Sequence, residues 1–155
     1  MAVIDVANVM GARADGWWRD RAGAALRLGR EVGALARRGD EATSEVGMWI
    51  LVLEGRARQA AAMLLADEGG DEGGDEGGDE GGDEGDDEAE GEGEPPLVRV
   101  VSAPGSGDDA IVGVVAEAAA RDERCLVVTA DRELRRRCEE LNASVVGPRW
   151  LLALL

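Results

Sequence analysis

Side chains that carry oxygen follow four successive apolar stretches of the sequence. They are Asp5 and Asn8 after the first stretch, Glu54 after the second, Ser106, Asp108 and Asp109 after the third, and Thr129 and Asp131 after the fourth. Carboxylate and other oxygen ligands are those that Mg²⁺ or Mn²⁺ prefer in proteins. If the fold brings these residues together, the pattern predicts an acidic Mg²⁺ or Mn²⁺ site.

The chain contains no histidine. This absence excludes Ser-His-Asp triads, Cys-His catalysis and zinc sites ligated by histidine. A cation held by carboxylates can still bind phosphate oxygens, activate a water and stabilise a leaving oxygen. Hydrolysis of phosphodiesters therefore fits the residues that the chain has.

Each of these positions also has a structural explanation. A carboxylate at Asp5, inside an apolar stretch, is costly unless it is paired, as in a salt bridge, and Asn8 alone is typical of a turn. Ser106 and Asp109 have the S-x-x-D spacing of a capping box. Asp108 and Asp131 each suit the first turn of a helix. Their joint placement after successive apolar stretches favours a functional site over four separate caps.

Apolar stretches alternate with amphipathic segments along the chain. Strands are expected at residues 2–5, 46–55, 97–103, 124–130 and 143–147, and helices at about 17–38, 56–66, 108–122 and 131–142, with a last helical turn from 148. The segment 10–16 is expected to be a loop. This order predicts an α/β fold, a Rossmann-like three-layer sandwich with a mostly parallel sheet of four to five strands. Ligands bind outside the carboxyl ends of such strands, where the oxygen-bearing residues stand.

One stretch of low complexity interrupts this single predicted domain of residues 1–155. Residues 67–94 repeat a DEGG unit, and 16 of these 28 positions are acidic while 11 are glycine. The formal charge of −16 belongs to this stretch, because the other residues sum to zero. Low hydrophobicity and repulsion between like charges predict that it is disordered.

The cysteines and the lengths of the apolar runs point to a cytoplasmic protein. Cys125 and Cys138 lack C-x-x-C spacing and lie in apolar patterns, so we expect a reduced, buried pair. No apolar run approaches the roughly 20 residues of a membrane span. Asp5 interrupts the first apolar run, so no signal peptide is expected.

The stretch VIDVANVMG resembles the D-x-x-N opening of NYN-domain proteins, which resemble PIN nucleases. SGDDAI and VVTAD resemble the later acidic motifs of that family. The resemblance implies a PIN-like sheet, a site for Mg²⁺ or Mn²⁺ and ribonuclease activity on an RNA substrate. Carried over, it assigns the site to Asp5, Asn8, Asp109 and Asp131, with Asp108 beside them. Asp109 precedes AIV, as the helix-start Asp of PIN-like proteins does, so the resemblance implies that it ligates the metal together with Asp5 and Asp131. Asp108 is expected to be an outer ligand or a base that orients a water.

Other functions stay open at this stage. One is a nucleotide or phosphoester hydrolase, although the helices lack the E-x-x-E pair of nucleoside triphosphate pyrophosphohydrolases and DVAN lacks the second Asp of a phosphatase D-x-D. Another is a non-catalytic RNA- or protein-binding module, and a homodimer is also open. Trp17 and Trp18 could stack on bases, and phosphates could bind at Arg13, Arg19 and Arg21. A charge of −16 repels nucleic acid, so a nuclease requires the acidic stretch to stand away from the site.

Overall fold

Five parallel strands form one sheet in the computed structural model, which describes residues 1–39, 41–68 and 97–155. The strand order is β3-β2-β1-β4-β5. The strands are β1 (Ala2–Asp5), β2 (Trp49–Leu53), β3 (Val98–Ser102), β4 (Leu126–Val128) and β5 (Ser144–Val146). This arrangement confirms the predicted α/β fold and its parallel sheet, because each neighbouring pair of strands runs in the same direction.

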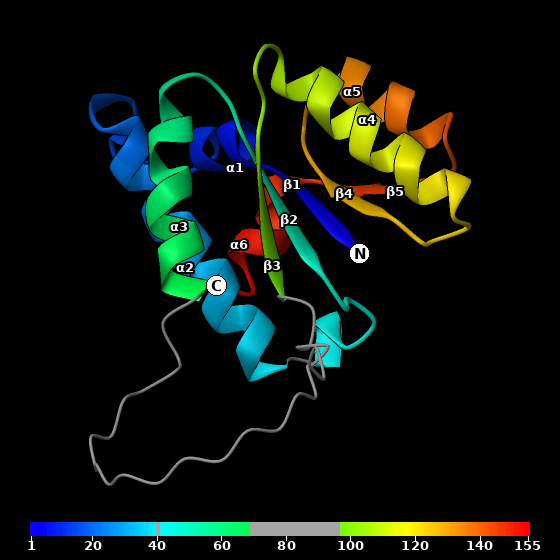
Figure 1. Ribbon diagram of the computed structural model, residues 1–155, viewed down its shortest axis with the longest axis horizontal. Helices are drawn as coiled ribbons and strands as arrows, with labels where there is room; N and C mark the ends of the chain where they lie inside the picture. The colour runs from blue at the N-terminus through cyan, green and yellow to red at the C-terminus, as the bar shows by residue number, and fades with distance from the viewer. Residues whose placement is uncertain (40, 69–96) are drawn as a thin grey trace, which may run out of the picture.

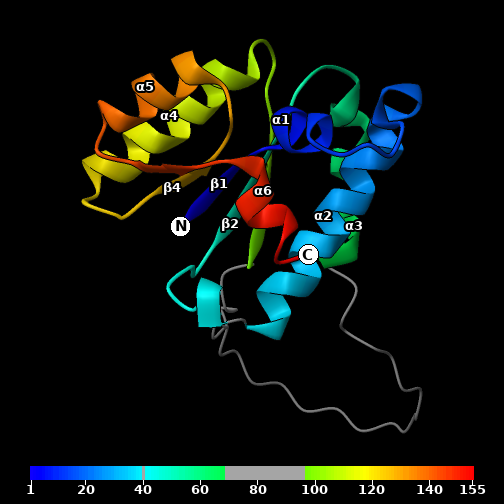
Figure 2. The same ribbon diagram turned by 180° about the vertical axis from the view of Figure 1, so that it is seen from behind.

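Helices connect the strands throughout the described part of the chain. The α-helices are α1 (Val6–Gly11), α2 (Arg21–Arg38), α3 (Ala61–Glu68), α4 (Gly107–Ala120), α5 (Arg132–Glu139) and α6 (Pro148–Leu152). Three short 3₁₀ segments accompany them, η1 (Trp17–Arg19), η2 (Glu41–Thr43) and η3 (Gly55–Ala60). Helices α4 and α5 cover one face of the sheet, and α1, α2, α3 and α6 cover the other (Figures 1 and 2).

The core consists of two apolar layers, one on each face of the sheet. Alternate residues of a strand point to opposite faces, so Ile4 and Leu51 pack with α1 and α2 while Val3 and Ile50 pack with α4 and α5. Both faces are covered, which explains why the strands are nearly continuous apolar runs.

Helix α2 shows how local sequence sets an element. Its apolar residues recur at three- and four-residue spacing, and Leu28, Val32 and Leu35 are buried on the sheet. The Asp20 carboxylate accepts a hydrogen bond from the Gly23 N–H at the start of the helix. The predicted helix began four residues too early, because Trp17–Arg19 form a separate 3₁₀ turn before the cap residue Asp20.

Two expected boundaries were wrong. Residues 6–11, where no helix was expected between the first strand and the loop at 10–16, form helix α1, because Asp5 caps α1 by accepting a hydrogen bond from the Asn8 N–H at 3.0 Å. Asp67 and Glu68, assigned to the disordered stretch, belong to helix α3. Asp67 Oδ2 accepts a hydrogen bond from Arg30 Nε at 2.8 Å, which connects this end of α3 to α2. The remainder of the expected disordered stretch, residues 69–94, lies outside the described residues.

The carboxyl ends of all five strands meet at one edge of the sheet. The described chain resumes at Leu97, directly before the amino end of β3 and therefore at the opposite edge (Figure 1). Among the described residues, no helix has the length and apolar composition needed to cross a membrane.

Candidate functional site

Asp5 lies where the strand order changes direction. Its strand, β1, pairs with β2 on one side and β4 on the other. In open parallel sheets, this switch point is where ligands bind, at the carboxyl ends of the strands. The Asp5 side chain is 8% exposed, so a carboxylate stands at the floor of this edge.

Thr129 ties two of the predicted acidic residues together. Its fully buried hydroxyl donates a hydrogen bond to Asp5 Oδ2 at 2.9 Å and accepts one from the Asp131 N–H at 3.1 Å. The Asp131 carboxylate in turn accepts a hydrogen bond from the Leu134 N–H at 2.8 Å and caps α5. Thr129 therefore fixes the ends of β1 and β4 relative to each other.

Glu54 brings a third carboxylate to the same edge. Its Oε2 accepts a hydrogen bond from the Gly107 N–H at 2.8 Å, at the first residue of α4. Ser106 is the N-cap residue of α4, but its side chain makes no capping hydrogen bond. The capping box suggested by Ser106 and Asp109 therefore does not form, because the Glu54 carboxylate occupies that helix end.

Two carboxyl groups of this edge have perturbed acidity. Burial raises the pKa of Asp5, and the negative charges of Asp108 and Glu54 raise it further, although hydrogen bonds from the Asn8 N–H and the Thr129 hydroxyl act in the opposite direction. Burial also raises the pKa of Asp108, with added repulsion from Asp131 and Glu54. Asp5, Glu54, Asp108 and Asp131 thus interact electrostatically, and we call these four residues the acid cluster.

Asp109 points away from the acid cluster. Its Oδ1 accepts a hydrogen bond from Arg137 Nη2 of α5 at 2.8 Å, and its side chain is 72% exposed. The structure therefore places Asp108, and not Asp109, beside the other carboxylates, which reverses the order expected from the resemblance. The physical reason is the helical period: Asp108 precedes Ile111 and Val115 by three and seven residues and so lies at the margin of the buried stripe of α4.

Asn8 has a structural contact in this structure. Its side-chain oxygen accepts a hydrogen bond from the Ala130 N–H at 2.9 Å, which joins α1 to the residue that follows Thr129. Asn8 also lines a hollow of about 660 Å³ between α1 and the start of α6, together with Ala130 and Arg149. The hollow adjoins the switch point on the face opposite α4, and Asn8 therefore positions the chain between this space and the acid cluster.

The donor atoms of the acid cluster suit a hard divalent cation. They are carboxylate oxygens with a threonine hydroxyl behind them, and two of the carboxyl groups have pKa values raised partly by mutual repulsion, which a cation would relieve. Within residues 1–39, 41–68 and 97–155, however, no three His, Cys, Asp or Glu side chains stand close enough together to hold a metal ion. A cation bound at the acid cluster would therefore have at most two of these carboxylates as direct ligands and would keep most of its water, as Mg²⁺ usually does.

Comparisons with protein-family models, with curated proteins and with solved structures find no match to this chain.

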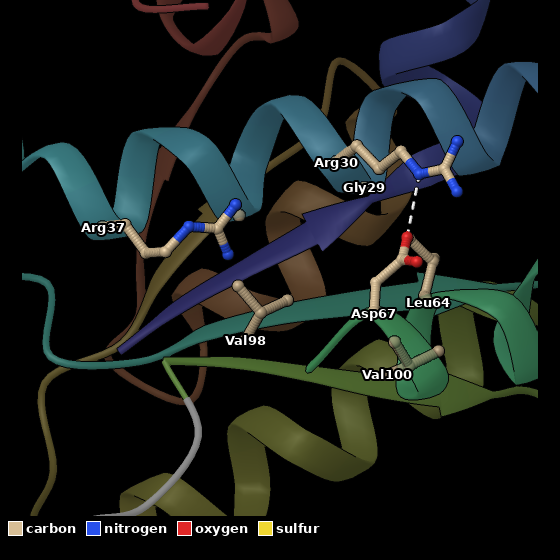
Figure 3. Close-up of a pocket in the computed structure, with 8 residues that line it drawn as sticks. Gly29, Arg30, Arg37, Leu64, Asp67, Val98 and Val100 are labelled. Atoms are coloured by element: carbon tan, nitrogen blue, oxygen red, sulfur yellow. Dashed lines mark hydrogen bonds and ion pairs between the residues drawn. The ribbon is translucent and has the colours of Figure 1, made fainter. Parts of the chain in front are cut away.

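A second hollow, of about 390 Å³, lies between α2, α3 and β3 (Figure 3). It contains the ion pair of Arg30 with Asp67, and Arg37 points along its rim (Figure 3). Val98 and Val100 form its floor from the edge strand. The acid cluster does not contribute to this hollow, so it is separate from the candidate site.

Sequence reasoning pointed to Glu54 and Thr129 as oxygen-bearing residues but did not include them among the site residues, and it missed Arg137 altogether. Arg137 pairs with Asp109, and its positive charge lowers the pKa of Asp108. Two signals were available. Thr129 directly follows the apolar run of β4, and Glu54 directly follows that of β2. Nothing local in the sequence indicates Arg137, because its partner is 28 positions away.

Proposed function

We propose that this protein is a ribonuclease that hydrolyses RNA phosphodiesters with a carboxylate-held Mg²⁺ or Mn²⁺, as its resemblance to NYN-domain and PIN-like proteins implies. The observation that carries the proposal is the acid cluster at the switch point of the sheet. Asp5 is buried there, and no ion pair to a basic side chain is found for Asp5, Glu54 or Asp131 in the described part of the chain. A buried acid without a positive partner at a ligand-binding edge is typical of a functional site, and Asp5 is such an acid.

The protein residues have distinct roles in this proposal. Asp108 and Asp131 would hold the cation, at the mouth of the cluster, and Asp5 would support them from the floor. Thr129 positions Asp5 and the start of α5 through its two hydrogen bonds. Glu54 holds the amino end of α4, and thereby Asp108, at the sheet edge. When bound, the divalent cation supplies charge neutralisation for phosphate oxygens and lowers the pKa of water.

We assign Asp108 a second role, that of orienting a water beside the cation. Burial and the negative charges of Asp131 and Glu54 act on the pKa of Asp108 in the raising direction, and the charge of Arg137 acts in the lowering direction. A bound cation would also lower the pKa of Asp108 and keep it a carboxylate. Asp108 would then accept a hydrogen bond from a water of the cation, in addition to holding the cation.

The positions of the flanking residues support this function despite the net charge. Asp67 lines the same hollow as Val98, the first residue of β3, so it lies near the amino ends of the strands. Leu97 precedes that strand. The two described ends between which the acidic stretch is attached therefore lie at the edge opposite the acid cluster.

One observation favours a second function, that of an RNA-binding module without catalysis. No three potential ligands in the described residues stand within reach of one ion. An RNA-binding module needs no set of metal ligands, and its acid cluster would bind no metal. The two functions differ in whether a cation binds and whether RNA is cut.

The test is cleavage of a panel of labelled single-stranded and hairpin RNAs with Mg²⁺, with Mn²⁺ and with excess chelator. We expect cleavage only with a metal, and a loss of at least about 100-fold in Asp131→Asn, because removing one preorganised electrostatic group from an active site costs on that scale and Asp131 would hold the cation. Asn still caps a helix, so α5 is kept. Asp109→Asn is the matched control and should keep most of its activity. Full cleavage in chelator, or equal activity in both variants, refutes the proposal.

The described cysteines agree with a proposed cytoplasmic location. Cys125 and Cys138 are both free and buried. Reduced thiols of this kind are usual in the cytosol, and the proposed activity requires neither of them.

A further inference from the structure

An exposed tryptophan lies on the same side of the molecule as the acid cluster. Trp18 belongs to the 3₁₀ turn η1 and is 58% exposed, one of few large apolar side chains on the described surface. It lines a hollow of about 460 Å³ together with the rest of this turn, the start of α2 and η3, namely Arg19, Asp20, Arg21, Ala22, Arg56 and Gln59. We call this hollow the Trp18 groove.

The backbone and neighbours of Trp18 hold it in place. Gly16 has φ +77°, a left-handed conformation that favours glycine, and it starts the 3₁₀ turn. The Trp17 ring packs against the core and meets the Trp18 ring edge to face, with 6.4 Å between centroids. The Arg21 guanidinium stands 5.3 Å from the centroid of the Trp17 ring. An indole that is exposed but fixed costs little conformational entropy when it binds a ligand.

The charge of the Trp18 groove is positive. Three arginines line it against one aspartate, and the Asp20 carboxylate is already engaged with the Gly23 N–H. No described acidic side chain forms an ion pair with Arg19 or Arg56. By contrast, Arg13, which the sequence placed with this group, pairs with Glu31 on α2 and is not available.

We propose that the Trp18 groove binds a single-stranded RNA segment, with a base stacked on Trp18 and phosphates held by Arg19 and Arg56. Aromatic stacking combined with a positive groove is how single strands are bound without sequence preference. Arg56 stands two residues after Glu54, so η3 links the groove to the acid cluster along the carboxyl edge. The segment it holds adjoins the phosphodiester at the acid cluster, and in this respect the inference rests on the proposed function.

Fluorescence anisotropy of a labelled 12-mer of oligouridylate tests the groove in chelator, where no cleavage is expected. Trp18→Ala should weaken binding about tenfold, because base stacking contributes on that scale. Arg56→Ala should weaken it several-fold and reduce the slope of log affinity against log salt by about 0.7, the contribution of one phosphate contact on a single strand. Trp18→Phe should retain most of the affinity.

Arg121→Ala is the matched control for charge. Arg121 is exposed at the end of α4, away from the carboxyl edge, and its removal deletes one positive charge outside the groove. It should lower affinity by less than twofold. Melting curves of all variants verify folding, since Trp18 and Arg56 are exposed.

The outcomes separate the two proposals. Binding that depends on Trp18 and Arg56 supports the groove even if no metal condition yields cleavage, which refutes only the ribonuclease. Cleavage that persists while Trp18→Ala and Arg56→Ala bind RNA like the parent overturns the groove alone. Failure of the parent to bind the 12-mer at low salt also overturns the proposal that the Trp18 groove binds RNA. The exposed tryptophan would then be assigned to contact with a protein partner.

Discussion

Gly107→Ala tests the contact that fixes Glu54 and α4 at the sheet edge. An added Cβ at Gly107 would stand 2.7 Å from Glu54 Oε2 and 3.1 Å from its Cδ. The carboxylate is the end of a flexible side chain, so it would swing away and lose its hydrogen bond to the Gly107 N–H. Gly107→Ala therefore acts on the long-range cap of α4 and not on the core.

The expected magnitude follows from the groups involved. Loss of a hydrogen bond to a charged group lowers the free energy of unfolding by about 1.5–3 kcal/mol. Replacing a glycine in a helical conformation by alanine raises it by about 0.5–1 kcal/mol. Gly107→Ala should therefore lower the free energy of unfolding by about 1–2 kcal/mol. Gly113 is the matched control in the same helix, because a Cβ there would meet nothing within 4 Å. Gly113→Ala should raise stability by about 0.5–1 kcal/mol.

Urea denaturation monitored by circular dichroism measures both variants. In a Glu54→Ala background, Gly107→Ala should no longer destabilise the protein, because the partner is already absent. Equal stabilisation by the two alanine substitutions in the parent would refute the Glu54 cap. So would an unchanged cost of Gly107→Ala after Glu54 is removed.

Three further predictions concern buried groups. For Asp5, whose pKa is raised mainly by burial, the native state binds the extra proton, so stability falls as pH rises from about 4 through the raised pKa. Asp5→Asn should therefore be more stable than the parent at pH 7, by about 1.4 kcal/mol for each unit by which folding raises the pKa of Asp5. Below about pH 3 the two proteins should be equally stable in urea titrations. A stability advantage of Asp5→Asn that grows as the pH falls would contradict this prediction. Thr129→Val should lower the free energy of unfolding by about 1–3 kcal/mol, because two hydrogen-bonding groups lose their buried partner. Calorimetric melting measures this change, and an unchanged stability would contradict the prediction. Burial raises the pKa of Cys138 to about 11, so Ellman's reagent at pH 8 should label it only after denaturation.

The sequence predicted the strands well because burial on both faces leaves an unmistakable apolar run. The helix Val6–Gly11 was missed because its residues are as apolar as the strand before it, and only the cap made by Asp5 separates the two. The choice of Asp109 over Asp108 followed a resemblance between motifs. The stripe of Ile111 and Val115, extended one turn toward the amino end, would have indicated Asp108.

Contacts between distant positions could not be predicted from local pattern. Gly107 and Glu54 are separated by 53 positions, and Thr129 and Asp5 by 124. Such pairs can be predicted only when the strand order is known, because the order decides which strand ends are neighbours. The sequence therefore supplied the set of acidic residues, and the fold decided which of them face one another.

The most direct measurement of the central claim is a calorimetric titration of Mn²⁺ into the parent, Asp108→Asn and Asp109→Asn. The acid cluster predicts one site in the parent, a loss of affinity of at least tenfold in Asp108→Asn, and nearly unchanged affinity in Asp109→Asn. Asp109 is paired with Arg137 and largely exposed, so it serves as the adjacent control. Unchanged affinity in Asp108→Asn, or a loss confined to Asp109→Asn, would contradict a metal site built on the acid cluster.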